Sequence, residues 1–304
     1  MTELLSNSSC IRLHWIRIGF YLVAAIILVT LGTGSFGRGE ALFLRVGSHW
    51  HFFLIGILAA TVANSTGAGG GIVFLPVFTV LGLTVTESLA TSFAIQCFGM
   101  TAGALTWLLH LKRDAVCDAQ TSGFLRIFLV SACGSLLGLR LAQEFLPDPG
   151  VKIEWFFSFF SLAVGLLILR RTFVLGTVNG GRDREASSRE LAGVAVTTFI
   201  GGAITAWLSV GVGEILAIHL LALRYRVNVA VAAAVCVTSI TVITAVPYYL
   251  TEQAIVKEVL VFAAPGALIG GTLAKRFAIL LGAKRLKLGM AGWIILTAIV
   301  YLIV

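Results

Sequence analysis

The stretch Gly67-Ala-Gly-Gly-Gly-Ile-Val-Phe-Leu-Pro76 interrupts a strongly apolar part of the chain with four glycines and a proline. Part of this pattern returns 142 residues later in Gly211-Val-Gly-Glu-Ile-Leu, where Gly211 and Gly213 correspond to Gly69 and Gly71. Short apolar segments that are interrupted by glycine or proline at matching places in two halves of a chain are typical of substrate sites in membrane transporters. The motif therefore indicates both an architecture and a place to look for function.

The composition is that of a polytopic membrane protein. Of 304 residues, 58% are hydrophobic and 12% are charged, and the mean hydropathy is +1.00, whereas soluble globular chains carry about 25% charged residues. A net charge of +8 would suggest nucleic-acid binding in a soluble protein. Here the basic residues lie in short connections between apolar segments, where they orient helices in a bilayer. We therefore expect a multi-pass protein of the cell membrane, with lipid as its surroundings and no nucleic-acid partner.

Two apolar segments, at 72–83 and 212–223, are too short to cross a membrane, because a crossing takes about 20 residues. We expect half-helices, each paired with the segment before it and turning at 67–71 or 209–213. The first apolar run follows basic residues as in a signal peptide, but no small-residue cleavage pattern closes it, which favours a retained helix. The other apolar segments are expected at 16–31, 51–65, 88–110, 123–142, 153–170, 191–208, 228–250, 257–275 and 286–304.

The distribution of basic residues predicts the orientation. The connection at 171–190 is the richest in arginine and is expected in the cytoplasm, whereas the acidic-leaning connections near 144–154 and 252–258 are expected outside. These assignments agree with one another when every apolar segment, including the two short ones, changes side. The same count places further basic residues in the cytoplasm, namely Lys112, Arg113, Arg224, Arg226, Lys275, Arg276, Lys284, Arg285 and Lys287.

Five segments then lie within 51–170 and five within 191–304. A unit with an odd number of crossings enters the membrane in opposite orientations when it is repeated, which gives inverted-topology repeats. The predicted fold class is an all-α polytopic membrane protein with two inverted repeats, whose short broken half-helices meet near the bilayer centre. The predicted division is an N-terminal helix and connection at 1–50, a first repeat at 51–170, a cytoplasmic connection at 171–190 and a second repeat at 191–304.

A second echo between the halves supports this division. Gly134-Ser-Leu-Leu-Gly138 and Gly266-Ala-Leu-Ile-Gly270 occupy corresponding segments. Both are GxxxG patterns, which allow membrane helices to approach closely. We therefore expect each pattern to lie at a tight helix contact.

The glycine stretch at 67–76, followed by Ala90-Thr91-Ser92, resembles the TauE/SafE family of membrane anion exporters, as does Pro265-Gly-Ala-Leu-Ile-Gly270. The resemblance covers most of 51–280. The second half departs from the family pattern, because Ile218 stands at the proline position and Glu214 stands where the first copy has Ile72. Family members are associated with sulfite, sulfoacetate and related anions, so the resemblance implies a small sulfur-containing or organic anion as substrate.

Backbone N–H groups in the glycine turns and the positive ends of the half-helices form a natural anion site. Polar side chains beside the turns could donate to substrate oxygens, although serine and threonine also satisfy helix carbonyls, and the glycines could serve only a tight turn. The candidate substrate-binding residues are Asn64, Ser65, Thr66, Gly67, Gly69, Gly70, Gly71, Thr91, Ser92, Gln96, Ser209, Gly211 and Gly213.

Glu214 is the residue whose burial costs the most free energy, because a carboxylate inside a membrane is expensive and marks a functional hypothesis. A role in coupling transport to a proton is one interpretation, and coupling to a sodium ion is another. The structural alternative is a helix-capping or ion-paired glutamate, with Arg224 or Arg140 as partner. His219, five residues further on, is a candidate proton relay or a packing residue.

These features favour a secondary transporter that works by alternating access, with an uncoupled anion channel as the alternative. Zinc-protease, Walker and GxSxG motifs are absent from the sequence, so we expect neither an enzyme nor a bound metal or cofactor. A coupling proton or sodium ion and a homo-oligomeric assembly are both compatible with the sequence.

Overall fold

The computed structural model describes residues 2–36, 40–114, 118–145, 153–174 and 186–303. All regular structure in these ranges is helical. Six of the helices are long and apolar enough to cross a membrane, as the composition predicts for a multi-pass protein. The helices are α1 (Thr2–Phe36), α2 (Glu40–Thr66), α3 (Gly71–Val80), α4 (Val85–Asp114), α5 (Asp118–Phe145), α6 (Ile153–Val174), α7 (Ser188–Leu208), α8 (Val212–Ala222), α9 (Val227–Thr251) and α10 (Lys257–Ile303).

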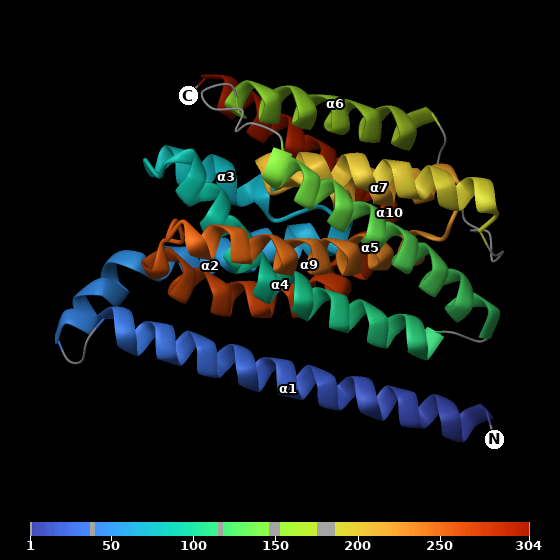
Figure 1. The fold of residues 1–304 in the computed structure, drawn as a ribbon, viewed down its shortest axis with the longest axis horizontal. Coiled ribbons are helices and arrows are strands. Elements are labelled where there is room, and N and C mark those ends of the chain that lie inside the picture. Colours follow the sequence, from blue (N-terminus) through green and yellow to red (C-terminus); the bar gives the residue numbers. More distant parts are fainter. Residues whose placement is uncertain (1, 37–39, 115–117, 146–152, 175–185, 304) are drawn as a thin grey trace.

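The long helices run in broadly similar directions, with α1 along one edge of the bundle and α6 along the opposite edge (Figure 1). Helices α4 and α9 form the centre, where most of each apolar stretch is buried within the protein. By contrast, only 11% of the apolar stretch of α1 is buried. Its exposed side chains, which include Trp15, Leu22 and Ile26, suit contact with lipid rather than water.

The two short segments form short helices, as predicted. Helix α3 has 10 residues and α8 has 11, and each follows a long helix after a break of a few residues. The order of long and short helices from α2 to α6 returns from α7 onward. The span labelled α10 contains two helices that meet at a kink at Gly282, whose φ is 71°. The kink lies between the two segments predicted at 257–275 and 286–304. Helix α2 begins at Glu40, earlier than the predicted 51.

Both GxxxG patterns lie at tight helix contacts, as predicted. A Cβ atom added to Gly138 on α5 would overlap the carbonyl oxygen of Phe199 on α7. A Cβ atom at Gly266 on α10 would overlap the carbonyl oxygen of Phe53 on α2. The two pairs, α5 with α7 and α10 with α2, therefore pack backbone against backbone, which positions the C-terminal ends of α2 and α7 where the breaks occur.

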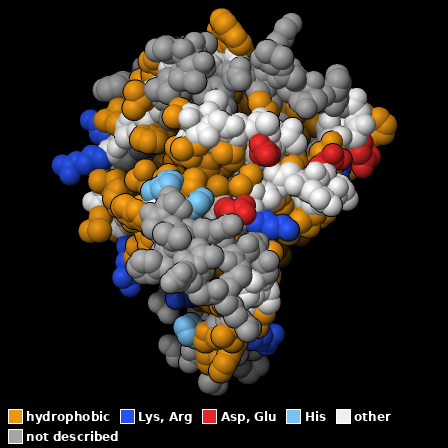
Figure 2. Space-filling view, turned by 90° about the vertical axis from the view of Figure 1, so that its left-hand side faces the viewer, with side chains coloured by type: hydrophobic (Ala, Val, Ile, Leu, Met, Phe, Trp, Pro, Cys, Tyr) orange, Lys and Arg blue, Asp and Glu red, His pale blue; other side chains and the backbone are white. Residues whose placement is uncertain are grey.

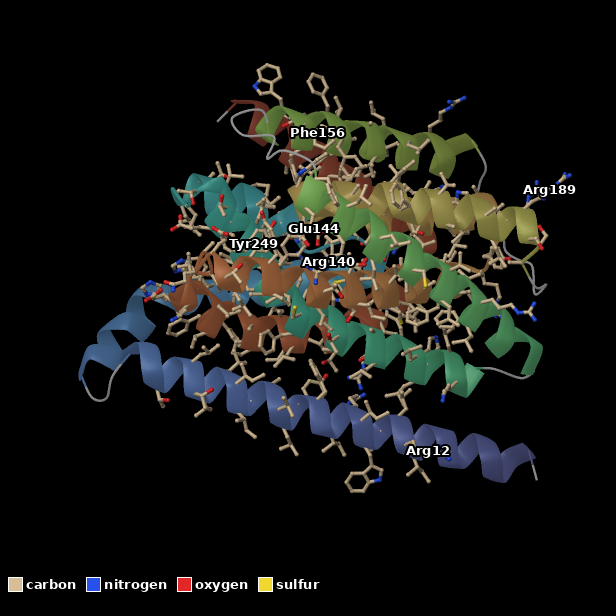
Figure 3. The ribbon with its side chains drawn as sticks, viewed as in Figure 1. Arg12, Arg140, Glu144, Phe156, Arg189 and Tyr249 are labelled. Atoms are coloured by element: carbon tan, nitrogen blue, oxygen red, sulfur yellow. The ribbon has the colours of Figure 1, made fainter. Side chains whose placement is uncertain are left out.

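The ends of the bundle differ in their residues. Arg189, near the start of α7, lies at one end of the molecule, and Tyr249, near the end of α9, lies towards the other (Figure 3). Arg12 on α1 shares the end with Arg189. At the opposite end, charged and histidine side chains are scattered among apolar ones (Figure 2). Most of the arginine-rich connection at 171–190 lies outside the described residues.

Candidate functional site

The helix breaks arise from residues with unusual backbone conformations. Helix α2 ends at Thr66, and Gly67 follows with φ 84°. Helix α7 ends at Leu208, and the chain turns through Ser209 with φ 53° and Gly211 with φ 140°. Positive φ values are readily adopted by glycine and rarely by other residues. The glycines thus allow the sharp turns that the sequence predicts at both places.

The two breaks are far apart in the chain and contact each other directly. A Cβ atom added to Gly71 would lie 2.6 Å from the carbonyl oxygen of Ser209, and one at Gly69 would lie 2.9 Å from the same oxygen. A Cβ atom at Gly213 would overlap the carbonyl oxygen of Gly67. Only glycine permits this approach of one backbone to the other, which explains why glycine occurs at these three positions.

The Glu214 carboxylate joins the two breaks. Its Oε1 accepts a hydrogen bond from the backbone N–H of Gly69 at 2.7 Å, and its Oε2 accepts one from the N–H of Gly211 at 2.8 Å. The second bond is a helix cap, because Glu214 is the third residue of α8. The first bond spans 145 residues of sequence. Glu214 therefore occupies the position beside the two half-helix starts that the sequence predicts for an anion.

The surroundings compensate the charge of Glu214 through dipoles. Its side chain is 1% exposed, and it lies at the positive ends of both α3 and α8, where a negative charge is stabilised. Hydrogen bonds to an ionised group are about twice as strong as those between neutral groups. The predicted pairing with Arg140 or Arg224 is wrong: both arginines are exposed, and neither bonds the carboxylate in the described part of the chain.

A second polar connection crosses between the breaks through α4. The Gln96 side chain accepts a bond from the Gly70 N–H at 2.7 Å and donates to Ser209 Oγ at 2.7 Å. Ser92 Oγ lies 3.0 Å from Ser209 Oγ and accepts a bond from Gln96 Nε2 at 3.0 Å. Four of the predicted site residues thus form one buried network. This network bonds the Gly70 N–H, whereas Glu214 bonds the neighbouring Gly69 N–H of the same break.

The three polar residues before the first break mainly satisfy their own helix. Ser65 donates to the Thr61 carbonyl, Thr66 donates to the Val62 carbonyl at 2.9 Å, and Asn64 Nδ2 donates to the carbonyl of Ala60 at 2.8 Å. Thr66 Oγ1 also accepts a bond from the Ala68 N–H at 3.2 Å, so it stabilises the turn. Asn64 Oδ1 is buried and has no hydrogen-bond partner among the described residues.

Two further predicted residues contact other elements. Thr91 Oγ1 accepts a bond from the N–H of Val256 at 3.0 Å, immediately before α10 begins. His219 Nδ1 lies 3.2 Å from Thr197 Oγ1 on α7. These contacts place the Thr91 side chain beside the start of α10 and the His219 side chain at the contact between α7 and α8.

The structure adds residues that sequence reasoning missed. Thr205 Oγ1 accepts a bond from the Val212 N–H at 3.0 Å, which satisfies the first residue of α8. Thr238 on α9 has a buried hydroxyl without a partner among the described residues, and a Cβ atom on Gly213 would lie 2.6 Å from that oxygen. A threonine in an apolar helix is the only sequence feature that could have indicated these two residues, and it is too common in this chain to single them out.

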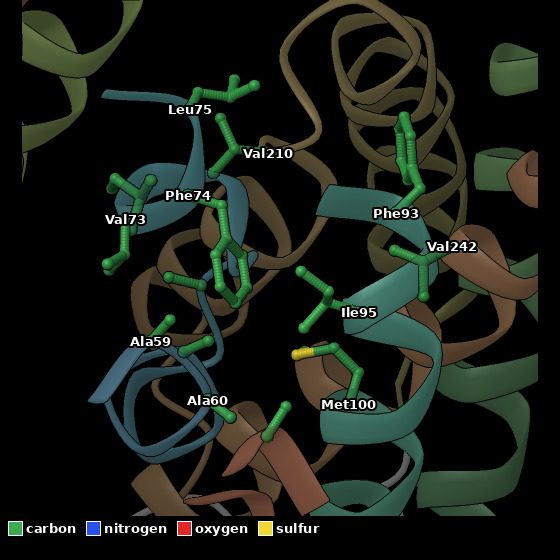
Figure 4. Close-up of a cluster of buried hydrophobic side chains, with 14 of the residues drawn as sticks. Ala59, Ala60, Val73, Phe74, Leu75, Phe93, Ile95, Met100, Val210 and Val242 are labelled. Carbon is green, nitrogen blue, oxygen red and sulfur yellow. The ribbon is translucent and has the colours of Figure 1, made fainter. Parts of the chain in front are cut away.

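Apolar side chains enclose the breaks. Phe74 and Leu75 of α3 lie beside Val210 of the second break, while Phe93 and Ile95 project from α4 nearby (Figure 4). All five are at most 4% exposed. Hydrogen bonds are electrostatically stronger in such a medium than in water, and an unpaired polar group is correspondingly costly. The paired N–H groups and the Glu214 carboxylate are therefore enclosed by apolar side chains and shielded from solvent.

The family comparison covers this part of the chain. Residues 52–301, which include both breaks and the residues that bridge them, match the family model described as Sulfite exporter TauE/SafE. No curated protein and no solved structure matches the chain.

Proposed function

The chain belongs to the TauE/SafE family, and from this premise we propose that it is a secondary transporter that exports a small sulfur-containing or organic anion by alternating access. The family consists of membrane transporters of sulfite and related anions rather than enzymes. The proposed substrate site comprises the N–H groups at the two breaks, together with Ser92, Gln96 and Ser209.

The observation that carries the proposal is the position of the Glu214 carboxylate, bonded to the N–H of Gly69 and of Gly211. An internal anion bonded at both breaks supports these N–H groups as an anion site. A substrate anion that enters the site has to displace the carboxylate or bind beside it. Since two negative charges repel strongly in an apolar medium, substrate binding favours a neutral Glu214.

Protonation gives a mechanism for this exchange. A protonated carboxyl group loses the charge that strengthens both N–H bonds, and one of its oxygens becomes a donor. The bonds that join the two breaks then weaken, and the N–H groups become available to substrate. Proton and anion bind together in this scheme, which is the proposed coupling. Export then occurs when the outward gradient of the anion exceeds the inward gradient of the proton. If sodium rather than a proton binds Glu214, anion accumulation in proteoliposomes should respond to a sodium gradient instead of a pH gradient.

The repeated order of long and short helices supports two inverted repeats, each contributing one half-helix to a site near the bilayer centre. Rocking of one repeat against the other would expose the site to each side in turn. An uncoupled anion channel would use the same N–H groups, but it would not require a carboxylate between them. Glu214 therefore favours the transporter.

Flux into proteoliposomes tests the proposal. Labelled sulfite, sulfoacetate and taurine are offered outside, with and without a pH gradient, and protein-free liposomes give the background. Protein-dependent flux of sulfite or sulfoacetate is expected, and a more acidic outside should drive accumulation. Flux that equilibrates without responding to proton or sodium gradients would support the channel, and absence of protein-dependent flux of any anion would contradict the function.

A further inference from the structure

Helix α4 follows the first break in the chain, but its polar side chains bond the second break. Ser92 Oγ lies 3.0 Å from Ser209 Oγ. Gln96 Nε2 donates to the Ser209 hydroxyl at 2.7 Å and to the Ser209 carbonyl oxygen at 3.3 Å. All three residues are buried. The second break is therefore held by side chains that come from the other half of the chain.

Helix α9 follows the second break and makes the reciprocal contact with the first one. A Cβ atom added to Gly67 would lie 2.8 Å from the Cβ atom of Ala234. A Cβ atom added to Gly213 would lie 2.6 Å from the Thr238 hydroxyl oxygen and would overlap the carbonyl oxygen of Gly67. The Thr238 hydroxyl and the Gly67 carbonyl are therefore neighbours at the contact between the breaks.

The two sets of contacts occupy matching places in the two halves. Each residue of the first half has its counterpart 142 residues later, which is the offset that relates the glycine motifs: Gly67 with Ser209, Ser92 with Ala234, and Gln96 with Thr238. The contact of Ser92 with the second break thus matches the contact of Ala234 with the first break. By the same correspondence, Thr238 is the counterpart of Gln96.

These two counterparts differ in their hydrogen bonds. Gln96 bonds both Gly70 and Ser209. The Thr238 side chain is 2% exposed, and its hydroxyl has no partner among the described residues. An unpaired buried hydroxyl destabilises the state in which it occurs. A movement of α9 against the first break that lets this hydroxyl donate to the Gly67 carbonyl would remove that cost.

We propose that Thr238 is a positioning residue for transport, whose hydroxyl donates to the Gly67 carbonyl oxygen when the site faces the opposite side of the membrane from the state described here. In inverted repeats, rocking of one repeat against the other exchanges the arrangements of the two halves. Thr238 then holds the first break as Gln96 holds the second break here. This inference rests on the proposed function, because it requires two states that face opposite sides.

Two substitutions separate the hydroxyl from the shape of the side chain. Thr238→Val keeps the branched shape and removes the hydroxyl, so it should disfavour the opposite-facing state about fivefold, which corresponds to about 1 kcal/mol for one hydrogen bond. Thr238→Ser keeps the hydroxyl and should retain the wild-type balance between the states. Thr244→Val is the matched control on α9, because the Thr244 hydroxyl donates to the Ile240 carbonyl of its own helix.

The balance is measured from the half-saturation concentrations for flux of labelled sulfite or sulfoacetate, determined separately from each side in vesicles where the protein has one orientation. An anion on one side binds only the state that faces it, so a shift between the states raises one half-saturation concentration and lowers the other. Their ratio should change about fivefold in Thr238→Val. It should stay at the wild-type value in Thr238→Ser and in Thr244→Val.

The outcomes distinguish this inference from the proposed function. An unchanged ratio in Thr238→Val would overturn the role of Thr238, and so would a change of both half-saturation concentrations in the same direction, which indicates lost substrate contact instead. If Thr238→Val does not reach the membrane, Thr238→Ala removes the same hydroxyl and has to change the ratio in the same direction. Absence of protein-dependent flux in the wild type would instead contradict the proposed function.

Discussion

At the residue scale, a single substitution can separate the proposed coupling role of Glu214 from its structural role. Its two oxygens accept from N–H groups on different breaks, whereas a glutamine side chain offers one acceptor oxygen and an NH₂ group. Glu214→Gln therefore keeps at most one of these bonds and places its NH₂ group against a donor. One N–H group is left unpaired in a buried position.

We expect Glu214→Gln to lower the free energy of unfolding by about 1–3 kcal/mol, measured as a lower melting temperature in detergent. In proteoliposomes the variant should still exchange substrate but should not accumulate it in response to a pH gradient, because the amide has no proton to release. Accumulation at the wild-type level would refute the coupling role. A variant that fails to fold would instead support a purely structural role.

At the scale of elements, the break between α2 and α3 depends on Gly70 for space rather than for conformation. Its φ and ψ are −66° and −19°, which any residue adopts. A Cβ atom there would lie 2.9 Å from Gln96 Cγ. A side chain at this position must therefore displace Gln96, which holds the network with Ser92 and Ser209.

Gly70→Leu should abolish anion flux while the protein remains in the membrane, and Gly70→Ala should have a smaller effect because the Gln96 side chain can shift. Flux and membrane content are measured together. Gly19→Leu is the control, because a Cβ atom at Gly19 has no neighbour within 4 Å among the described residues. Normal flux through Gly70→Leu would show that the break is only a spacer.

At the scale of the whole molecule, inverted repeats require the 171–190 connection and the 251–256 connection to face opposite sides. Single cysteines at Asp183 and Gln253, introduced after replacement of the five native cysteines, test this arrangement. A membrane-impermeant thiol reagent applied outside should label position 253, which is exposed, and should not label position 183 until the membrane is permeabilised. The reverse pattern would contradict the five-plus-five arrangement.

Much of the architecture could be predicted because it depends on local chemistry. Glycine-rich turns and segments too short to cross a bilayer identify α3 and α8, and the GxxxG patterns identify tight contacts. Long-range partners could not be predicted in the same way. Nothing near Glu214 in the sequence indicates that it bonds Gly69, and the buried, unpaired hydroxyl of Thr238 is evident only in the folded protein. The two apolar segments predicted at 257–275 and 286–304 are separated by the kink at Gly282.

The carboxylate at the breaks has a consequence for selectivity against common anions. Glu214 is held by its own helix three residues from Gly211, so its effective concentration at these N–H groups far exceeds that of any dissolved ion. Chloride would have to compete with the Glu214 carboxylate for the N–H groups of Gly69 and Gly211. It is a single atom, whereas the carboxylate has one oxygen for each N–H group. If the N–H groups at the breaks are the anion site, we expect the Glu214 carboxylate to exclude halide from the resting protein, so that only an anion that binds further donors takes its place.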